Sequence, residues 1–331
     1  MQLREAIAKA VKWVWKGKQR SPTKSVRFLP SNNGGRGALY ATNGPQGILL
    51  FLDQGEWIPD AMLDAEKLSA AITNVKEVRL TADGAMVSVA GVAIESGNVH
   101  EYPPIPQLPP GDFQPMPDWP TVEKLLHAVS KDPQQPVLRC LHFRHDLVEA
   151  TDRFRVARAC VRTPWEGLVP AEAFRHLPQG EMSALFDEDM AVFRVGEELR
   201  FSTLKKGTFQ DCDKLLPVGL PAGWSTVRVE TADLVRVAKR AKALAPACGL
   251  LLTNTEASLR VDGFQEQLPA VVSPSSTTPV AVSLHVNAEW LVDAVSRVST
   301  PVTRLGFASP GDPLRIESGA YCVGLWPFMG G

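Results

Sequence analysis

The chain has 331 residues, of which 44% are hydrophobic and 21% are charged, and its formal net charge is −1. This length predicts two or three globular domains, and no apolar run is long enough to cross a bilayer. The N-terminal residues lack the apolar stretch and cleavage site of a secretory signal. The five cysteines are widely scattered, which indicates reduced thiols in a cytoplasmic protein rather than a disulfide framework.

The charges are segregated along the chain. Residues 1–20 carry six basic residues against the single acid Glu5, and residues 231–244 carry four against Asp233. Acidic residues gather elsewhere, between residues 187 and 198. This distribution is typical of a protein with one surface that faces DNA.

The first elements in chain order are an amphipathic helix and several short strands. Leu3, Ile7 and Val14 lie on the apolar face of this N-terminal helix. Its polar face carries Lys9, Lys12 and Lys16. Asp64 is a candidate N-cap for a second helix that runs to residue 72. Alternating segments predict strands at residues 26–28, 38–42, 77–80 and 86–89.

Residues 103–120 contain eight prolines, which predicts an extended interdomain linker. The pattern then restarts with a helix at 121–130 and a second helix at 170–177, with Pro170 in its first turn. The strands expected in this repeat are at residues 137–143, 147–161, 191–195 and 199–202.

A third copy begins with a helix at residues 231–244, which starts 110 residues after the helix at 121. Asn287 is a candidate N-cap for a further helix at 288–298. The strands expected here are at residues 249–253, 258–261, 281–286, 302–308 and 314–328. A repeat of this length predicts that each copy is a whole domain rather than a solenoid unit.

The segment 150–156, Ala-Thr-Asp-Arg-Phe-Arg-Val, resembles the Ala-Thr-Asp-Gly-His-Arg-Leu segment of the bacterial DNA polymerase III β subunit (β sliding clamp) family. The resemblance covers nearly the whole chain, and Arg153-Phe154 departs from it. It implies an α+β fold of three repeated sliding-clamp (DNA clamp) domains, each with two helices packed on antiparallel sheets. The implied domains are residues 1–110, 111–224 and 225–331.

The resemblance also implies a function. Clamps of this family form a ring-shaped homodimer around double-stranded DNA, are placed there by a clamp loader, and tether the DNA polymerase and other partners. They catalyse nothing and need no cofactor. The tether works by raising the effective concentration of the polymerase at its template. The chain is therefore expected to be a processivity factor in DNA replication.

In this family, basic helix faces line the ring and contact phosphates without reading the sequence, which permits sliding. The matching residues are Lys9, Lys12, Lys16, Lys124, Arg236, Lys239 and Arg240. An ordinary solvated surface is the alternative. For residues 1–20, with Trp13 and Trp15, a membrane surface is another.

Family clamps also bind short peptide motifs in a cleft between the second and third domains. The matching positions are Thr151, Arg155, Val156, Leu177, Pro217, Trp326, Pro327 and Phe328. Trp326 and Phe328 stand where Met is usual, which predicts a narrower and less adaptable pocket. A packed terminal strand is the alternative for these two aromatic residues.

Ring closure in the family pairs an edge strand of the first domain with the third domain of another copy. The matching segments are residues 92–102 and 243–252, and Leu244 is the candidate dimer-interface residue. A specialised phage or mobile-element clamp that recruits non-polymerase proteins remains an alternative.

A hydrolase or a metal enzyme on an unrelated α+β fold is the alternative from another class. Cys140, His142 and His145 resemble a ligand cluster, but on a strand His145 would point to the opposite side. No second pair completes a tetrahedral site, so no metal is expected. The remaining histidines form no catalytic triad pattern, and the glycine-rich segment 33–37 lacks the Lys-Ser/Thr of a phosphate loop.

Overall fold

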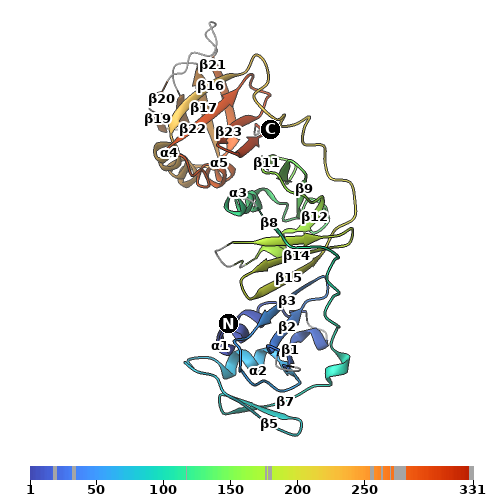
Figure 1. Cartoon of the computed structure of the whole chain (residues 1–331). Coiled ribbons are helices and arrows are strands. Elements are labelled where there is room, and N and C mark those ends of the chain that lie inside the picture. The colour runs from blue at the N-terminus through green and yellow to red at the C-terminus, as the bar shows by residue number, and fades with distance from the viewer. Residues whose placement is uncertain are drawn as a thin grey trace. The chain divides into compact units, whose positions relative to one another are not determined.

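The computed structural model describes residues 1–17, 21–31, 35–116, 118–175, 177, 181–253, 257–261, 264–268, 270–271 and 281–327. The chain forms two compact units. Unit 1 contains residues 1–116 and 172–204, and unit 2 contains residues 117–171 and 205–331. Figure 1 shows the elements of both units.

Unit 1 is built on an eight-stranded antiparallel sheet with the order β4-β1-β2-β3-β15-β14-β13-β8. Its strands are β1 (Ser25–Leu29), β2 (Ala38–Thr42), β3 (Gln46–Phe51), β4 (Ala61–Asp64), β8 (Gln114–Pro115), β13 (Ser183–Phe186), β14 (Met190–Val195) and β15 (Glu198–Thr203). A second sheet contains β5 (Leu80–Asp83), β6 (Met86–Val89) and β7 (Val92–Glu95). The helices are α1 (Leu3–Ala10) and α2 (Ala65–Ala71), with short 3-10 turns at Pro22–Lys24 and Val99–Glu101.

The two helices of unit 1 bury their apolar sides against these sheets. Ile7 of α1 and Leu68 of α2 share one hydrophobic core with Phe28 and Leu39. The predicted N-cap of α2 is confirmed, because the Asp64 side chain accepts a hydrogen bond of 2.9 Å from the Lys67 backbone N–H.

The first helix ends earlier than the sequence predicts. α1 stops at Ala10, so Lys12 and Lys16 follow the helix rather than lie on it. The next residues are aromatic and β-branched, which disfavours helix. The Trp13 ring is buried under the guanidinium of Arg200, whose Cζ is 4.8 Å from the ring centroid.

Unit 2 contains a nine-stranded sheet with the order β12-β9-β10-β11-β24-β23-β22-β16-β20. Its strands are β9 (Cys140–Arg144), β10 (Leu147–Thr151), β11 (Arg155–Ala159), β12 (Gly167–Pro170), β16 (Ser225–Glu230), β20 (Ala270–Val271), β22 (Val302–Phe307), β23 (Leu314–Ser318) and β24 (Tyr321–Leu325). A four-stranded sheet, β19-β18-β17-β21, contains β17 (Ala247–Thr253), β18 (Ala257–Val261), β19 (Phe264–Leu268) and β21 (Ala281–Asn287).

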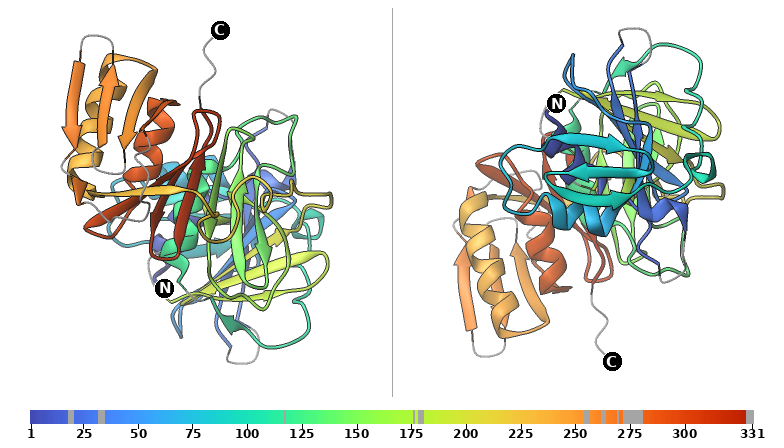
Figure 2. Two further views of the ribbon diagram at one scale, coloured as in Figure 1. Left: turned by 90° about the horizontal axis from the view of Figure 1, so that it is seen from above. Right: turned by 90° about the horizontal axis from the view of Figure 1, so that it is seen from below.

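The longest helix of unit 2 is α4 (Thr231–Leu244), which packs beside α5 (Ala288–Val295). Figure 2 shows this pair next to the orange strands of the four-stranded sheet. The Asn287 side chain caps α5 through the Trp290 N–H, as the sequence predicts. The helix expected at 121–130 is a short α3 (Trp119–Glu123) that continues as the 3-10 helix η3 (Lys124–Ala128).

Strand alternation gives the nine-stranded sheet two different faces. We call one the helix face, because its side chains, including Arg155 and Tyr321, point toward η3 and α5. The other carries Val156, Arg158 and Cys322, and residues 205–224 run across it. We call these residues the linker and this face the linker face.

The pairing between meanders follows one rule in the two large sheets. Three-stranded antiparallel meanders pair through their last strands, β3 with β15 in unit 1 and β11 with β24 in unit 2. Two further three-stranded antiparallel meanders are β5-β6-β7 and β17-β18-β19, and their last strands are β7 and β19. These strands, β7 and β19, lie at the edges of their sheets.

The structure bears on two further local predictions. The helix expected at 170–177 is a strand that ends at Pro170, followed by the single 3-10 turn Ala171–Phe174, because the short stretch before Pro178 cannot sustain an α-helix. Residues 243–252, the third-domain segment expected to contribute to ring closure, contain β17, which lies inside its sheet between β18 and β21. Among the helices of the described residues, none is long and apolar enough to cross a membrane.

Candidate functional site

An apolar cluster joins the linker to the linker face. Its buried members are Val156, Cys212, Leu216 and Cys322, and its partly exposed members are Phe209, Leu215 and Trp326. The Trp326 backbone N–H donates a hydrogen bond of 3.1 Å to the Phe154 carbonyl. A Cβ at Gly324 would lie 3.0 Å from Leu216 Cδ1, so glycine permits the linker to approach this closely. The cluster presents aromatic and aliphatic groups at the surface.

Three arginines hold the linker in place. Arg158 Nη1 donates to the Leu216 carbonyl at 2.6 Å, and Arg315 Nη1 donates to the Pro217 carbonyl at 2.7 Å. The Asp213 carboxylate accepts hydrogen bonds from Arg144 at 2.9 Å and from Arg158 at 2.8 Å. The hydrogen bond from Arg144 lowers the pKa of the Asp213 carboxyl, and the charge of Arg158 acts in the same direction.

The buried environment of the two cysteines in the apolar cluster makes their thiols unreactive. Burial raises the pKa of Cys212 to about 12 and that of Cys322 to about 12. Both side chains therefore remain neutral thiols near neutral pH and act as small apolar groups.

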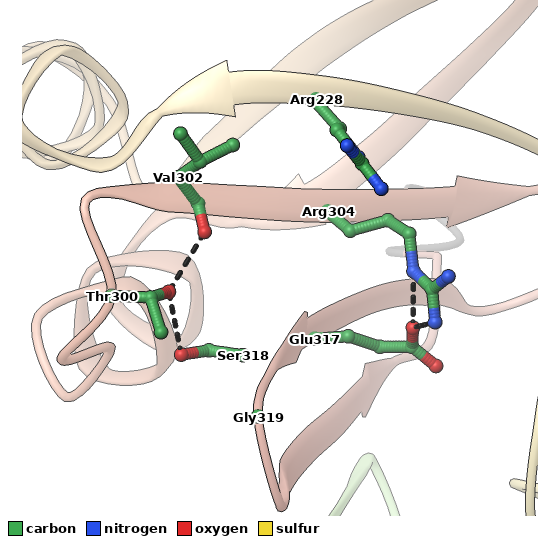
Figure 3. Close-up of a pocket in the computed structure, with 7 residues that line it drawn as sticks. All are labelled: Arg228, Thr300, Val302, Arg304, Glu317, Ser318 and Gly319. Carbon is green, nitrogen blue, oxygen red and sulfur yellow. Dashed lines mark hydrogen bonds and ion pairs between the residues drawn. The ribbon is translucent and has the colours of Figure 1, made fainter. Parts of the chain in front are cut away.

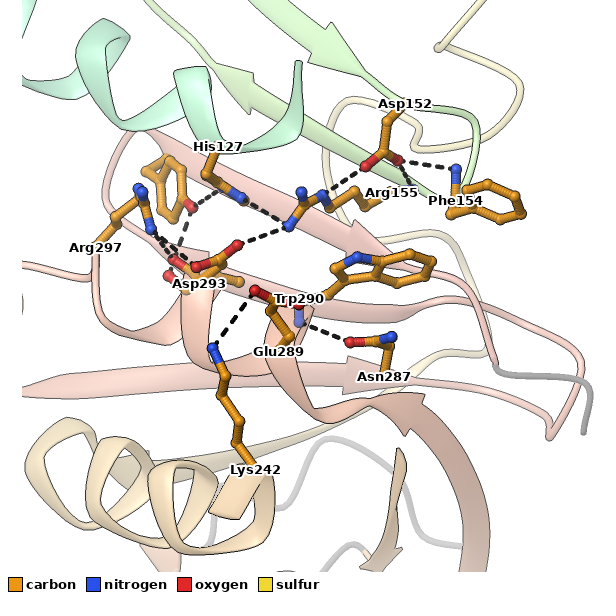
Figure 4. A network of polar contacts seen from close by, with 12 residues as sticks. His127, Asp152, Phe154, Arg155, Lys242, Asn287, Glu289, Trp290, Asp293 and Arg297 are labelled. Atoms are coloured by element: carbon orange, nitrogen blue, oxygen red, sulfur yellow. Dashed lines mark hydrogen bonds and ion pairs between the residues drawn. The ribbon is translucent and has the colours of Figure 1, made fainter. Parts of the chain in front are cut away.

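A polar network occupies the helix face of the same sheet (Figure 4). The Arg155 guanidinium is almost fully buried and binds Asp152 at 2.9 Å and Asp293 at 3.2 Å. The His127 Nε2 and the Tyr321 hydroxyl are 2.9 Å apart. Burial, together with the charge of Arg155, lowers the pKa of His127 well below its usual value. The His127 ring is therefore neutral and joins η3 to β24.

An aromatic pair lies at the rim of this network. The Phe154 ring is 58% exposed and stacks on Trp290, with ring centroids 5.4 Å apart. The Arg155 guanidinium lies 5.6 Å from the centroid of the same Trp290 ring. The turn between β10 and β11 is thereby packed onto helix α5.

The structure brings some of the residues expected to form the peptide pocket into the apolar cluster. Val156 and Trp326 meet in the apolar cluster, and Pro217 and Pro327 follow its members Leu216 and Trp326 along the chain. Thr151 is buried, and its hydroxyl donates to the Arg155 carbonyl at 2.8 Å.

The three other members of the predicted pocket are Arg155, Leu177 and Phe328. Arg155 points to the helix face, away from Val156, because neighbouring residues of a strand alternate. Leu177 belongs to unit 1, whereas the rest of the set belongs to unit 2. Phe328 lies outside the described residues.

Sequence reasoning missed several residues of the linker face. Phe209, Cys212 and Leu216 were not among the predicted site residues, and neither was Arg158. The spacing of Arg155 and Arg158 was a usable signal, because strand residues three apart point to opposite faces. A basic residue buried on each face needs an acid near it. Nothing in the sequence indicated that Asp213 would be the acid from the linker.

The basic residues predicted to face DNA on α4 form a partly neutralised strip. Arg236 and Arg240 both bind Glu266 of β19, Arg240 at 3.0 Å, and Arg236 also binds Asp233 at 2.9 Å. The hydrogen bond from Arg236 lowers the pKa of the Glu266 carboxyl. Lys239 is exposed and has no ion pair within the described part of the chain.

The remaining predicted DNA contacts lie outside α4. Lys9 pairs with Glu5 at 3.0 Å and with Glu198 at 3.5 Å, whereas Lys12 and Lys16 are exposed after the end of α1. Lys124 donates to the Ser299 hydroxyl at 3.0 Å, and its ammonium lies 6.0 Å from the Tyr321 ring centroid.

The suspected metal ligands are not brought together. Cys140 is buried and donates to the Pro136 carbonyl, His142 contacts Glu149 at 3.0 Å, and His145 contacts Glu166 at 3.4 Å. Among the described residues, no group of three or more His, Cys, Asp or Glu side chains could hold a metal ion.

Comparison with known proteins gives a clear result at the level of structure. No protein-family model matches the sequence, and no curated protein matches it either. Among solved structures, the β chain of DNA polymerase III from Streptococcus pneumoniae TIGR4 is 14% identical, with a TM-score of 0.83 over 99% of this chain and 97% of that chain.

Two of the similar structures carry ligands. The Helicobacter pylori β clamp bound to a DNA ligase peptide is 16% identical, with a TM-score of 0.81 over 99% of this chain and 97% of that chain. A sliding clamp from Bartonella birtlesii bound to griselimycin is 17% identical, with a TM-score of 0.81 and the same coverage. The chain has the fold of the DNA polymerase III β sliding clamps. The predicted α+β clamp fold is therefore confirmed.

Proposed function

We propose that this chain is a DNA sliding clamp, a non-catalytic ring that encircles duplex DNA and tethers a polymerase and other partner proteins. The clamp fold supports this, and the strand-pairing rule supports it most directly. Last strands pair twice inside the chain, and β7 and β19 are the two last strands left at sheet edges. An edge strand with open backbone groups pairs readily with another chain. If β7 of one copy pairs with β19 of the next, last strands pair between copies as they do inside the chain. Such head-to-tail contacts close into a ring when the rotation from one copy to the next permits it.

The three domains of the proposed clamp are residues 1–110, 111–224 and 225–331. We assign DNA contact to the basic strip of α4, with Lys239 as its unpaired member, and to Lys12 and Lys16. Contacts of this kind hold phosphates without reading bases, and their strength falls with salt.

We assign the partner-binding surface to the apolar cluster on the linker face. A short peptide needs a few partly exposed apolar anchors on a rigid support, and Trp326, Phe209 and Leu215 provide them. The DNA ligase peptide and griselimycin seen on related clamps are suitable probes of this surface.

The deciding experiment compares circular with linear DNA. The molecular mass of the protein in solution is measured first, because a ring-forming clamp is a dimer at micromolar concentration. A clamp loader and ATP then place it on nicked circular DNA, and the protein retained after gel filtration in high salt is measured. A clamp stays on the circle and leaves once the circle is cut, because only topology holds it. A monomer, or equal retention on both forms, would count against the ring.

A further inference from the structure

A second feature of the linker face is a groove of about 340 Å³ between β16, β22 and the β23–β24 hairpin (Figure 3). Arg228, Arg304 and Glu317 line it from three neighbouring strands. Arg228 lies directly opposite Arg304 in the antiparallel pairing, and Arg304 lies directly opposite Glu317. The three charged side chains therefore form one row across the sheet.

The positive charge of this row exceeds its negative charge. Glu317 is shared by two arginines, because Arg304 and Arg315 both bind its carboxylate. Arg228 is exposed, and its guanidinium makes no hydrogen bond or ion pair with any residue that the structure describes. Like charges directly opposite each other on two strands repel. Two guanidinium groups thus share one carboxylate while Arg228 has none, and an incoming anion would relieve the repulsion between Arg228 and Arg304.

The neighbouring hydroxyl groups are already hydrogen-bonded, which leaves Arg228 as the unpaired donor among the described residues that line the groove. The Thr300 hydroxyl bonds to the Val302 carbonyl at 2.7 Å and is 2.8 Å from the Ser318 hydroxyl. A ligand in the groove therefore meets guanidinium groups first. An arginine fork matches a carboxylate in plane and can bind it through two hydrogen bonds.

We propose that this groove binds an acidic side chain of the partner segment whose apolar residues occupy the apolar cluster. The proposal rests on the proposed function and adds a second requirement for the partner. Arg315 connects the two places, since it binds both the Pro217 carbonyl of the linker and Glu317. Three strand spacings separate β24 from β16, which is about 14 Å. About four extended residues cover this distance, so an acid about four residues from the apolar anchors reaches Arg228.

The first test uses a probe that does not depend on the apolar cluster. Tetraglutamate peptide is titrated at low salt, and the side-chain Nε–Hε signals of the arginines are followed by NMR, with tetraglutamine as the neutral control. We expect the signals of Arg228 and Arg304 to move with tetraglutamate only. Arg228→Gln should weaken this binding about tenfold, as the loss of a charged hydrogen bond does. The control Arg79→Gln, at an exposed arginine of unit 1 that pairs with Glu77 at 3.3 Å, should leave the binding unchanged.

Two outcomes overturn the proposal. One is an absence of tetraglutamate-dependent shifts at Arg228. The other is a larger response of the same signals to a short DNA duplex than to the acidic peptide, which would assign the groove to nucleic acid.

The second test joins the two surfaces. The ligase peptide is extended at either end by Gly-Ser-Gly-Glu or by Gly-Ser-Gly-Gln, and its affinity is measured by fluorescence anisotropy. We expect one of the Glu extensions to bind severalfold more tightly than its Gln counterpart, and Arg228→Gln to abolish the difference. Equal affinities for both pairs would contradict the proposed reach. If no peptide binds, the assignment of the apolar cluster fails, while the tetraglutamate titration still decides the role of Arg228.

Discussion

Arg158 Nη2 lies 2.8 Å from Oδ1 of Asp213, a residue 55 positions later in the chain. The same guanidinium binds Glu149 at 2.8 Å, and the Arg158 and Glu149 side chains are almost completely buried. Removing one partner from such a cluster leaves an uncompensated buried charge, which destabilises the folded protein. The linker that supports the candidate partner surface is therefore fixed by charge as well as by apolar packing.

This relationship predicts the effect of Asp213→Asn. The variant loses the ion pairs with Arg144 and Arg158, while Arg158 keeps Glu149. Because the Asp213 side chain is 43% exposed, we expect the free energy of unfolding at pH 7 to fall by only about 1 kcal/mol. Urea unfolding measures it.

The pH dependence of this effect follows from the lowered pKa of Asp213. A carboxyl group whose pKa is lowered by folding stabilises the folded protein at pH values above its ordinary pKa of 3.8. This stabilisation is lost as the pH falls through the pKa of the folded state. The difference between wild type and variant should therefore shrink below pH 4. Asp211→Asn, which removes an exposed pair with Lys214 at 3.3 Å, is the matched control and should have little effect at any pH.

Much of the fold could be predicted because it depends on local patterns. The 14-residue helix α4 has a regular apolar stripe, and Asp64 and Asn287 carry the side chains that cap α2 and α5. Two strands missed in sequence analysis, β12 and β13, are four residues long, and short strands give little periodicity. The six-residue strands β3 and β16 were also missed.

The candidate site could be predicted only in part. Val156 and Trp326 were found through the family resemblance, whereas the linker residues that meet them were not. A contact such as that between Arg158 and Asp213 joins distant segments, and no local pattern records it. The face on which Arg155 lies follows from strand alternation only once the register of β11 is known.

The ion pairs of α4 predict that Glu266→Gln strengthens DNA binding. This change frees Arg236 and Arg240 from their shared carboxylate, so two more guanidinium groups become available to phosphates. We expect tighter binding at low salt. We also expect a steeper slope of the logarithm of the affinity against the logarithm of the salt concentration, because each of one to two added phosphate contacts steepens this slope by about 0.9. Lys239→Glu should act in the opposite direction. Anisotropy with duplexes of two unrelated sequences measures both, and an unchanged salt slope in both variants would remove α4 from the DNA surface.

Leu244 tests ring closure. Its side chain is 58% exposed at the end of α4, next to the four-stranded sheet that contains β19. If this surface is covered by a second copy, Leu244→Asp buries an unpaired charge there and should convert the dimer to monomers at micromolar concentration. Leu108→Asp changes a leucine of similar exposure, 45%, in the proline-rich segment and should leave the mass unchanged. Analytical ultracentrifugation distinguishes the two results, and a dimeric Leu244→Asp protein would place the interface elsewhere.

His127 predicts a loss of stability in mild acid. Its pKa is lowered in the folded protein, so below pH 6.5 the unfolded chain takes up a proton that the folded chain does not. The free energy of unfolding should then fall with decreasing pH, by at most about 1.4 kcal/mol for each pH unit from this residue. His127→Gln removes the titrating group and should flatten the profile between pH 6.5 and pH 5. His145→Gln, at an exposed histidine that pairs with Glu166, should retain the wild-type slope.

Trp326 is the strongest single test of the partner surface. Its ring is partly exposed in the apolar cluster with Val156 and Leu216, and its backbone is held by the Phe154 carbonyl. A bulky aromatic anchor of this kind commonly provides a large share of the binding energy at an interface. Trp326→Ala should therefore weaken binding of the ligase peptide about tenfold or more, while the mass in solution and the retention on circular DNA stay unchanged. Trp57→Ala removes a tryptophan that is 58% exposed in unit 1 and should not alter peptide affinity. Because Trp is stiffer than Met, Trp326→Met should keep or improve the affinity for the peptide of a Met-lined clamp. Titration calorimetry measures all three variants, and undiminished affinity in Trp326→Ala would place the partner site on another surface.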